Sequence, residues 1–365
     1  MKKKIAGLLA LLFAMAAALT GCSRGTIDSA AEAMNVGGVS VPLGELNFYL
    51  RYQQVQMQRF YGSLFGENFM NQDLMGLGVP YGETVRDSVI ETMEEFYIVE
   101  AHAEELGISL SDEEKAAAAE SAKAFLAAND QKTLSAMSAD EPTVTHVLEL
   151  MALQSKARAD RAATIDREVA PEEAAQKRIS YVMSSKSEID EEGNETELTE
   201  VELAERMVQM TELLADAKES GDLSAAAESR NLTASTLTYG KNDSALDESV
   251  RKAADALSEG ELSDVIEAED GYYIVYMEST YDEEATQEEV EMILSERETE
   301  AYNAWYDSLK EAAEITTNEE LIGTLSFERN FMPPSEEEEP SGEETPEEEE
   351  LSGEEMPGEG EPSEE

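Results

Sequence analysis

The sequence predicts an α+β protein in which a mixed domain is inserted into a helical lobe. Apolar residues at helical spacing dominate the chain up to about residue 167. From Pro171 to about residue 282, strand-like and helix-like segments alternate, and from 286 to 313 a long amphipathic pattern returns. Because helical segments flank the mixed segment on both sides, we expect them to form one lobe.

The 365 residues are enough for two or three domains, and changes in composition suggest where the chain divides. The expected parts are a leader at 1–21, a helical part at 22–170, the mixed domain at 171–282, a returning helix at 283–331 and an acidic tail at 332–365. One small fold would not fill this length.

The composition excludes several classes of protein. With 82 acidic and 26 basic residues, the formal charge is -56. This excess excludes a nucleic-acid binder, which needs Lys and Arg to neutralise phosphates, and disfavours adhesion to anionic lipid through a basic patch. The chain has one Cys and two His, so no internal disulfide can form. We predict no metal site and no cofactor, and see no nucleotide-binding loop.

The N-terminus has the features of an export signal. Lys2, Lys3 and Lys4 precede an uncharged run of 15 residues at 5–19, which is too short to span a bilayer. The run ends in the sequence LTGC, which resembles the bacterial lipobox, and Cys22 is the only cysteine. We therefore expect Cys22 to be lipidated and to tether the mature chain to the membrane on its extracytoplasmic face. The alternative is that Cys22 is an incidental small residue after an ordinary cleavage site.

The last 34 residues differ from the rest of the chain. Residues 332–365 contain 16 Glu and no Lys or Arg, and are otherwise mostly Pro, Gly and Ser. Such a segment cannot bury enough apolar surface to offset its ordering entropy, so we expect it to be disordered. It either solubilises the chain or attracts cations or basic clients.

In the helical part, the sequence predicts a small strand or hairpin at 34–41 and then helices at 43–65 and 83–106. A capping box at Ser111 predicts a third helix, and 143–167 a fourth. Adaptable aromatic and Met side chains are concentrated near the first helix, as a groove for varied clients requires. They are Phe48, Tyr49, Tyr52, Met57, Phe60, Tyr61, Phe65, Phe69, Met70 and Met75. We expect about two-thirds of them to be core.

The mixed domain has the predicted order β-α-α-β-α-β-β. A strand at 178–183 is followed by a polar, exposed loop at 184–198, and a capping box at Thr199 opens a helix that ends at Gly221. The remaining elements are a helix at 223–230, a strand at 235–239, a helix at 247–257 and strands at 264–268 and 272–277.

This domain resembles the parvulin-type peptidyl-prolyl isomerases. The run GELSDVIEAEDGYYIV at 260–275 matches the family's Gly-Glu-x-Ser, strand, Gly-Tyr-His-Ile-Ile ending, while VRKAADAL at 250–257 and ISYVM at 179–183 follow its helix and first strand. PLGEL at 42–46 and AEELGISLS at 103–111 are similar to the SurA-like chaperone region. The resemblance implies an extracytoplasmic foldase of the PrsA and SurA type, with a helical SurA-like lobe around a parvulin-like domain.

The sequence departs from the family at the residues that matter for catalysis. Tyr181 and Tyr273 stand where the family has two His, and Val250 stands where a Phe forms the floor of the proline pocket. The resemblance also places Met183, Tyr239 and Ser263 beside the substrate. The two His residues of this chain, His102 and His146, fall in helices of the other lobe, where we expect surface positions or ordinary packing.

Rotation about an X-Pro bond crosses a barrier of about 20 kcal/mol, and a pocket shaped for the twisted amide lowers it. Because Val250 offers less contact area than Phe, substrate binding loses about 1–3 kcal/mol. We therefore predict weak or absent isomerase activity, and cross-strand packing rather than catalysis for the Tyr pair.

Three functions remain open from the sequence. The preferred one is a foldase that holds unfolded, newly exported polypeptides; the alternatives are an active prolyl isomerase and a surface lipoprotein that binds a solute or an envelope protein. Whether the chain forms a homodimer is also left open.

Overall fold

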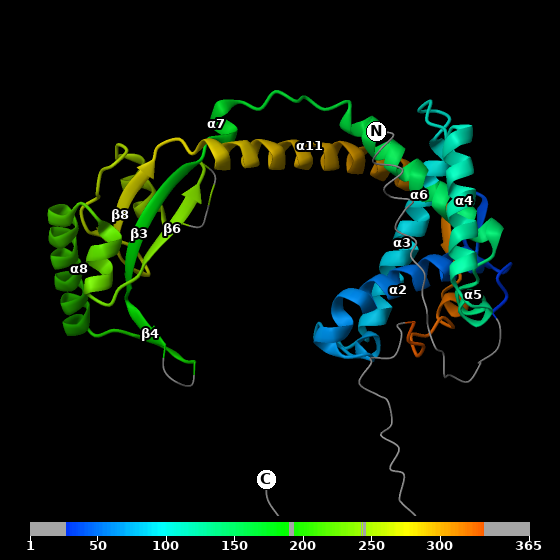
Figure 1. The fold of residues 1–365 in the computed structure, drawn as a ribbon, viewed down its shortest axis with the longest axis horizontal. Helices are drawn as coiled ribbons and strands as arrows, with labels where there is room; N and C mark the ends of the chain where they lie inside the picture. The colour runs from blue at the N-terminus through cyan, green and yellow to red at the C-terminus, as the bar shows by residue number, and fades with distance from the viewer. Residues whose placement is uncertain (1–26, 190–192, 242, 244–245, 332–365) are drawn as a thin grey trace, which may run out of the picture.

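The computed structural model describes residues 27–189, 193–241, 243 and 246–331. Figure 1 shows two lobes at opposite ends of an arch, joined by the long helix α11 and by the segment that leads into α7. The expected leader, the expected lipid anchor at Cys22 and the acidic tail lie outside the described residues. Among the described helices, none combines the length and the apolar character needed to cross a membrane.

The helical lobe contains the four predicted helices and a fifth that the sequence did not indicate. Their bounds are α2 (Leu43–Phe65), α3 (Tyr81–His102), α4 (Asp112–Ala128), α5 (Gln131–Met137) and α6 (Glu141–Ala162), with the short 3-10 helix η1 (Phe69–Asn71) after α2. The capping box at Ser111 is confirmed. The helices predicted at 83–106 and 143–167 each begin two residues earlier and end four or five residues earlier. The missed helix, α5, has seven residues, too few to show a helical period.

The N- and C-terminal segments meet in a small sheet of the helical lobe. β1 (Glu32–Val36) and β2 (Val39–Pro42) form the predicted hairpin, and β9 (Ile315–Thr317) adds to the other edge of β1, with Met34 opposite Thr317. The long helix predicted at 286–313 is present, and the rest of the expected segment 283–331 contains a strand and a short helix. α11 (Glu283–Ala312) ends before β9, and α12 (Glu319–Ile322) follows. Pairing with β9 satisfies the backbone groups along the edge of β1.

The core of the helical lobe is built by both of these segments. Phe48 of α2 meets Phe125 of α4 edge to face, with ring centroids 5.6 Å apart. Phe327 and Phe331, from the end of the described chain, are buried in the same core. The predicted insertion of the mixed domain into a single helical lobe is confirmed.

The mixed domain is a four-stranded antiparallel sheet in the order β6-β3-β8-β7. Its strands are β3 (Lys177–Ser185), β6 (Ala234–Tyr239), β7 (Ile266–Glu267) and β8 (Gly271–Ser279), and its helices are α8 (Glu200–Ser220), α9 (Leu223–Ser229) and α10 (Glu248–Asp255). One core cluster packs α8 and α9 against the sheet, and a second packs α10 against it. The predicted order of elements is confirmed.

The polar loop predicted at 184–198 contains a short hairpin of β4 (Ser187–Ile189) and β5 (Glu195–Glu197). Most of its described residues are exposed, as predicted, and Ile189 leaves 75% of its surface open. β5 has the sequence ETE, without the apolar alternation that marks a strand, so the hairpin could not be predicted from the sequence.

α11 is held at both ends and connects the lobes. At its start, Asp282 caps the helix and pairs with Arg178 of β3. Near its other end, Tyr302 is 1% exposed, its hydroxyl donates to Glu95 Oε1 (2.5 Å), and the Arg158 guanidinium lies 3.9 Å from its ring centroid.

The connecting segment before α7 (Pro171–Ala174) is held against α11 by polar contacts, among them the ion pair of Arg167 with Glu298. Arg297 Nη1 donates to the carbonyls of Asp166 (3.1 Å) and Glu168 (2.9 Å), and Nη2 pairs with Glu173 (2.8 Å). The two connections between the lobes therefore run side by side, as Figure 1 shows.

Candidate functional site

The two tyrosines at the family's His positions lie together on the sheet. Tyr181 of β3 and Tyr273 of β8 are diagonal neighbours, because Tyr181 is opposite Val275 and Met183 is opposite Tyr273. Their ring centroids are 6.0 Å apart. The predicted cross-strand contact is present.

The hydroxyl of Tyr273 has its own partner. It donates to Asp270 Oδ2 at 2.7 Å. Burial, together with this hydrogen bond and the negative charge of Asp270, raises the pKa of Tyr273 above its usual range. The phenol therefore stays protonated at physiological pH, and unlike an imidazole it offers no basic nitrogen.

Three of the four residues expected to contact a substrate are buried. Val250 of α10 is 0% exposed and belongs to a core cluster with Tyr273. Tyr239 is 2% exposed and donates to Asp255 Oδ1 (3.1 Å), and Ser263 is 5% exposed, with its Oγ accepting from the backbone N of Val275 (2.9 Å). Met183 is half-buried. Val250, Tyr239 and Ser263 therefore leave little side-chain surface open to solvent.

At the end of α2, in the helical lobe, large apolar side chains are exposed, unlike the buried side chains of the mixed domain described above. Large apolar side chains of the last turns of α2 and of the segment before α3 are exposed to solvent, and we call them the aromatic patch. They are Phe60 (73% exposed), Leu64 (72%), Leu77 (64%), Met75 (60%), Phe65 (49%), Tyr61 (41%) and Val79 (39%). Only Glu67 and Asp73 are charged between residues 60 and 79, so the patch interrupts a strongly acidic surface.

The ten aromatic and Met side chains predicted near the first helix differ in burial in the structure. Phe48, Tyr49, Phe69 and Met70 are buried. Tyr52 and Met57 are partly buried against the core, and the four remaining residues are exposed members of the patch. This agrees with the expectation that about two-thirds are core, but the sequence did not indicate which third is exposed.

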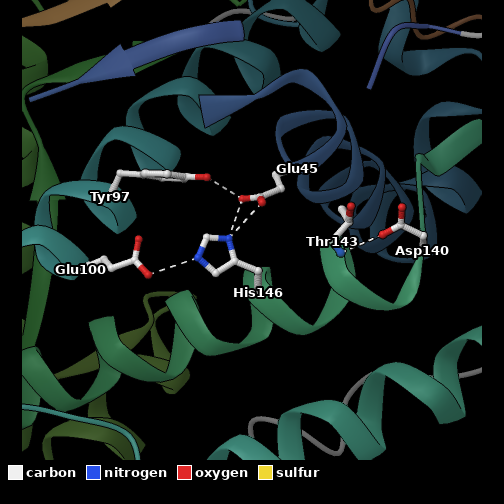
Figure 2. Close-up of polar contacts among 6 residues, drawn as sticks. All are labelled: Glu45, Tyr97, Glu100, Asp140, Thr143 and His146. Carbon is white, nitrogen blue, oxygen red and sulfur yellow. Dashed lines mark hydrogen bonds and ion pairs between the residues drawn. The ribbon is translucent and has the colours of Figure 1, made fainter. Parts of the chain in front are cut away.

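A polar network that the sequence did not indicate joins three helices of the same lobe (Figure 2). His146 of α6 lies between two carboxylates: its Nδ1 is 2.9 Å from Glu45 Oε1 of α2, and its Nε2 is 3.1 Å from Glu100 Oε1 of α3. Tyr97 of α3 donates its hydroxyl to Glu45 Oε2 at 2.7 Å. The expectation of a surface position or ordinary packing for His146 is wrong, because its imidazole bridges two acids.

The position of His146 follows from the local sequence. Asp140 caps α6 by accepting from the backbone N of Thr143 at 2.8 Å, as Figure 2 shows. His146 lies three residues, about one turn, after Thr143. Hydrogen bonds to Glu100 and Glu45 raise the pKa of His146 to about 10, so the imidazole is charged at neutral pH. The sequence signal for a partner of His146 was Glu45, an acidic residue in the first turn of α2. The structure shows this first turn to be buried.

The second histidine behaves as expected. His102, in the last turn of α3, lies near the surface and pairs with Glu105 at 3.1 Å. Across the residues that the structure describes, no group of three or more His, Cys, Asp or Glu side chains is arranged to hold a metal ion.

Comparison with protein families gives two matches. The PPIC-type PPIase domain matches residues 186–292, and the SurA-like N-terminal domain matches residues 1–138. Among curated proteins, no match to this chain is found.

Several solved structures are similar to this one. The foldase protein PrsA from Lactococcus lactis has 16% identity and a TM-score of 0.34, with 81% of this chain and 99% of that chain covered. The peptidylprolyl isomerase PrsA from Bacillus cereus has 15% identity and a TM-score of 0.31, with 82% of this chain and 98% of that chain covered. A SurA-like chaperone from Campylobacter jejuni has 15% identity and a TM-score of 0.26, with 79% of this chain and 99% of that chain covered. On the two family matches, the chain combines a SurA-like N-terminal domain with a PPIC-type PPIase domain.

Proposed function

We propose that this protein is a lipid-anchored, extracytoplasmic foldase that holds unfolded, newly exported polypeptides on its helical lobe and has weak or no prolyl isomerase activity. The observation that carries the proposal is the aromatic patch, where Phe60 and Leu64 leave more than 70% of their surfaces in solvent. Monomeric soluble proteins rarely expose such clusters unless they bind something.

The small number of charges near the patch supports binding of many clients. An apolar surface with few fixed charges selects for exposed apolar side chains, which unfolded chains have in common, and Met75 adds an adaptable contact. Capture by such a surface needs no nucleotide. Release then depends on the client burying its own apolar side chains.

The proposed anchor rests on the sequence of the first 22 residues. A basic start, a short apolar run and a lipobox-like LTGC support export and lipidation at Cys22. Two or more acyl chains would hold the chain stably at the membrane, whereas one would bind only marginally.

An active prolyl isomerase is the second candidate, because a PPIC-type domain is present. Against it, Val250 is fully buried where the proline floor is expected, and the tyrosine hydroxyl of Tyr273 is committed to Asp270. We therefore expect the PPIase domain to act as a structural or binding module.

An aggregation assay tests the proposal. The mature chain should suppress aggregation of a denatured client at near-stoichiometric ratio without ATP, and the double substitution F60S/L64S should reduce this at least fivefold. Both side chains are exposed, so the variant should fold normally. The matched control is V201S/V208S, which removes two exposed apolar side chains from α8 of the PPIase domain and should leave suppression unchanged.

Two results would contradict the proposal. Equal suppression by F60S/L64S and the parent would remove the patch as the capture surface, and failure of the parent with several clients would remove the holding function. A protease-coupled prolyl-peptide assay on the same samples decides between the two candidates, since clear acceleration by the parent chain would favour the active isomerase.

A further inference from the structure

Among the described residues, a buried arginine in α2 has no acidic partner. Arg51 is 6% exposed, its Nε donates to Asn47 Oδ1 (3.1 Å) and its Nη1 donates to Gln54 Oε1 (2.8 Å). Its guanidinium also lies 5.5 Å from the ring centroid of Phe327. All three neighbours are uncharged, and within the described ranges no carboxylate pairs with Arg51.

This isolation is unusual in so acidic a protein. Most of the other described basic side chains pair with an Asp or Glu, as Arg178, Arg230 and Arg297 do. Burial, with a smaller effect of the nearby positive charge of Arg329, lowers the pKa of Arg51 to about 10, so it remains charged at neutral pH. A buried charge without a counterion costs several kcal/mol, so a partner anion is expected.

Arg329 brings a second positive charge to the same place. Its backbone carbonyl accepts from Gln54 Nε2 at 2.7 Å, which holds the end of the described chain across α2. Arg329 is half-buried and, within the part of the chain that the structure describes, also has no carboxylate partner. The two arginines therefore form a positive site between α2 and the final segment.

The acidic C-terminal segment leaves the described structure at this site. The backbone N of Phe331 donates to Gln58 Oε1 (3.2 Å), and Gln58 is seven residues, about 10 Å, along α2 from Arg51. A run of four Glu begins at residue 336, five residues after Phe331. Five residues span up to about 17 Å, so these carboxylates can reach Arg51.

We propose that Arg51 and Arg329 form a carboxylate-binding site whose occupant is the acidic segment 332–365 of the same chain. The segment supplies 16 Glu and no competing Lys or Arg, which complements two arginines that have no acidic partner among the described residues. Guanidinium groups suit this role because they bind carboxylates with two parallel hydrogen bonds.

Cleavage by a Glu-specific protease tests the docking in the mature chain. In 25 mM salt, Arg329→Gln should speed cleavage within residues 332–365 at least fivefold, and 500 mM salt should speed cleavage of the parent and remove the difference. Arg51→Gln should act in the same direction, but Arg329 is the primary target because it is only half-buried and its loss should not affect folding. Arg59→Gln, which changes an exposed arginine on the same helix, should leave the rate unchanged.

Three outcomes would overturn the proposal. Equal cleavage of Arg329→Gln and the parent at low salt would show that the segment does not bind there. An equal effect of Arg59→Gln would show a general attraction to the lobe rather than a site. Full release of the segment by 1 mM inorganic phosphate at constant ionic strength would assign the arginines to small anions. None of these readouts depends on client capture, so they stay informative if the proposed function fails.

Discussion

The helical lobe and the PPIase domain place their apolar side chains in opposite ways. At the end of α2, Phe60 is 73% exposed although a large aromatic side chain gains by burial. On α10, Val250 is fully buried although the family resemblance assigns its position to a substrate pocket. At the two positions compared, the apolar side chain of the helical lobe is open to solvent and that of the PPIase domain is not.

The polar groups inside the two regions also differ, because one set is charged and the other is neutral. The helical lobe holds a charged bridge of His146 with Glu45 and Glu100 between three helices. In the PPIase domain, the hydroxyls of Tyr239 and Tyr273 each bond a nearby Asp instead. A charged bridge depends on pH over a wide range, whereas neutral phenols do not, so the two regions should respond differently to pH.

The largest effect is expected from Val250→Asp. It places an unpaired carboxylate in a fully buried position and should lower the free energy of unfolding of the PPIase domain by about 3–5 kcal/mol. Client capture by the helical lobe should persist. Denaturant unfolding followed by circular dichroism, with Val201→Asp on the exposed face of α8 as control, measures the difference. An unchanged stability would show that Val250 is accessible and that the pocket is open.

A smaller loss is expected from His146→Gln, which leaves Glu45 without its cation. The helical lobe should lose about 1–3 kcal/mol near pH 6. Because folding raises the pKa of His146 from 6.5 to about 10, its stabilisation is full below about pH 6.5 and disappears as the pH rises toward 10. The difference between the parent and the variant should therefore shrink over this range.

Unfolding of both proteins across pH 5.5–9.5 measures this dependence. His102→Gln, which removes a surface contact with Glu105, is the control and should change stability by less than about 0.5 kcal/mol. A difference that stays constant with pH would mean that His146 contributes only as a neutral hydrogen-bonding group.

The smallest effect is expected from Tyr273→Phe. It removes the hydrogen bond to Asp270 and should cost about 0.5–1.5 kcal/mol, while Tyr181→Phe, whose ring contact is kept, should cost less. Neither should alter the rate of prolyl isomerisation. A loss of isomerase activity in either variant, with the fold intact by circular dichroism, would return a catalytic role to the tyrosine pair.

Much of the fold was predictable because its signals are local. The capping boxes at Ser111 and Thr199 and the helical periods of α2 and α8 lie within a few turns of the residues they organise. The order of elements in the PPIase domain was predictable for the same reason. The hairpin of β4 and β5 was missed because its side chains face water on both sides and leave no apolar pattern.

The sequence by itself determined the caps, the periods and order of the main elements, the acidic composition of the C-terminal segment and the two positions where tyrosine replaces histidine. Only the tertiary structure decided that β9 closes the sheet with β1, that His146 joins Glu45 across about one hundred residues, and that Phe48 is buried while Phe60 is not. Local signals come from neighbouring residues and can be read along the chain. Burial and ion pairing depend on residues far apart in sequence, whose meeting is settled only when the lobes pack.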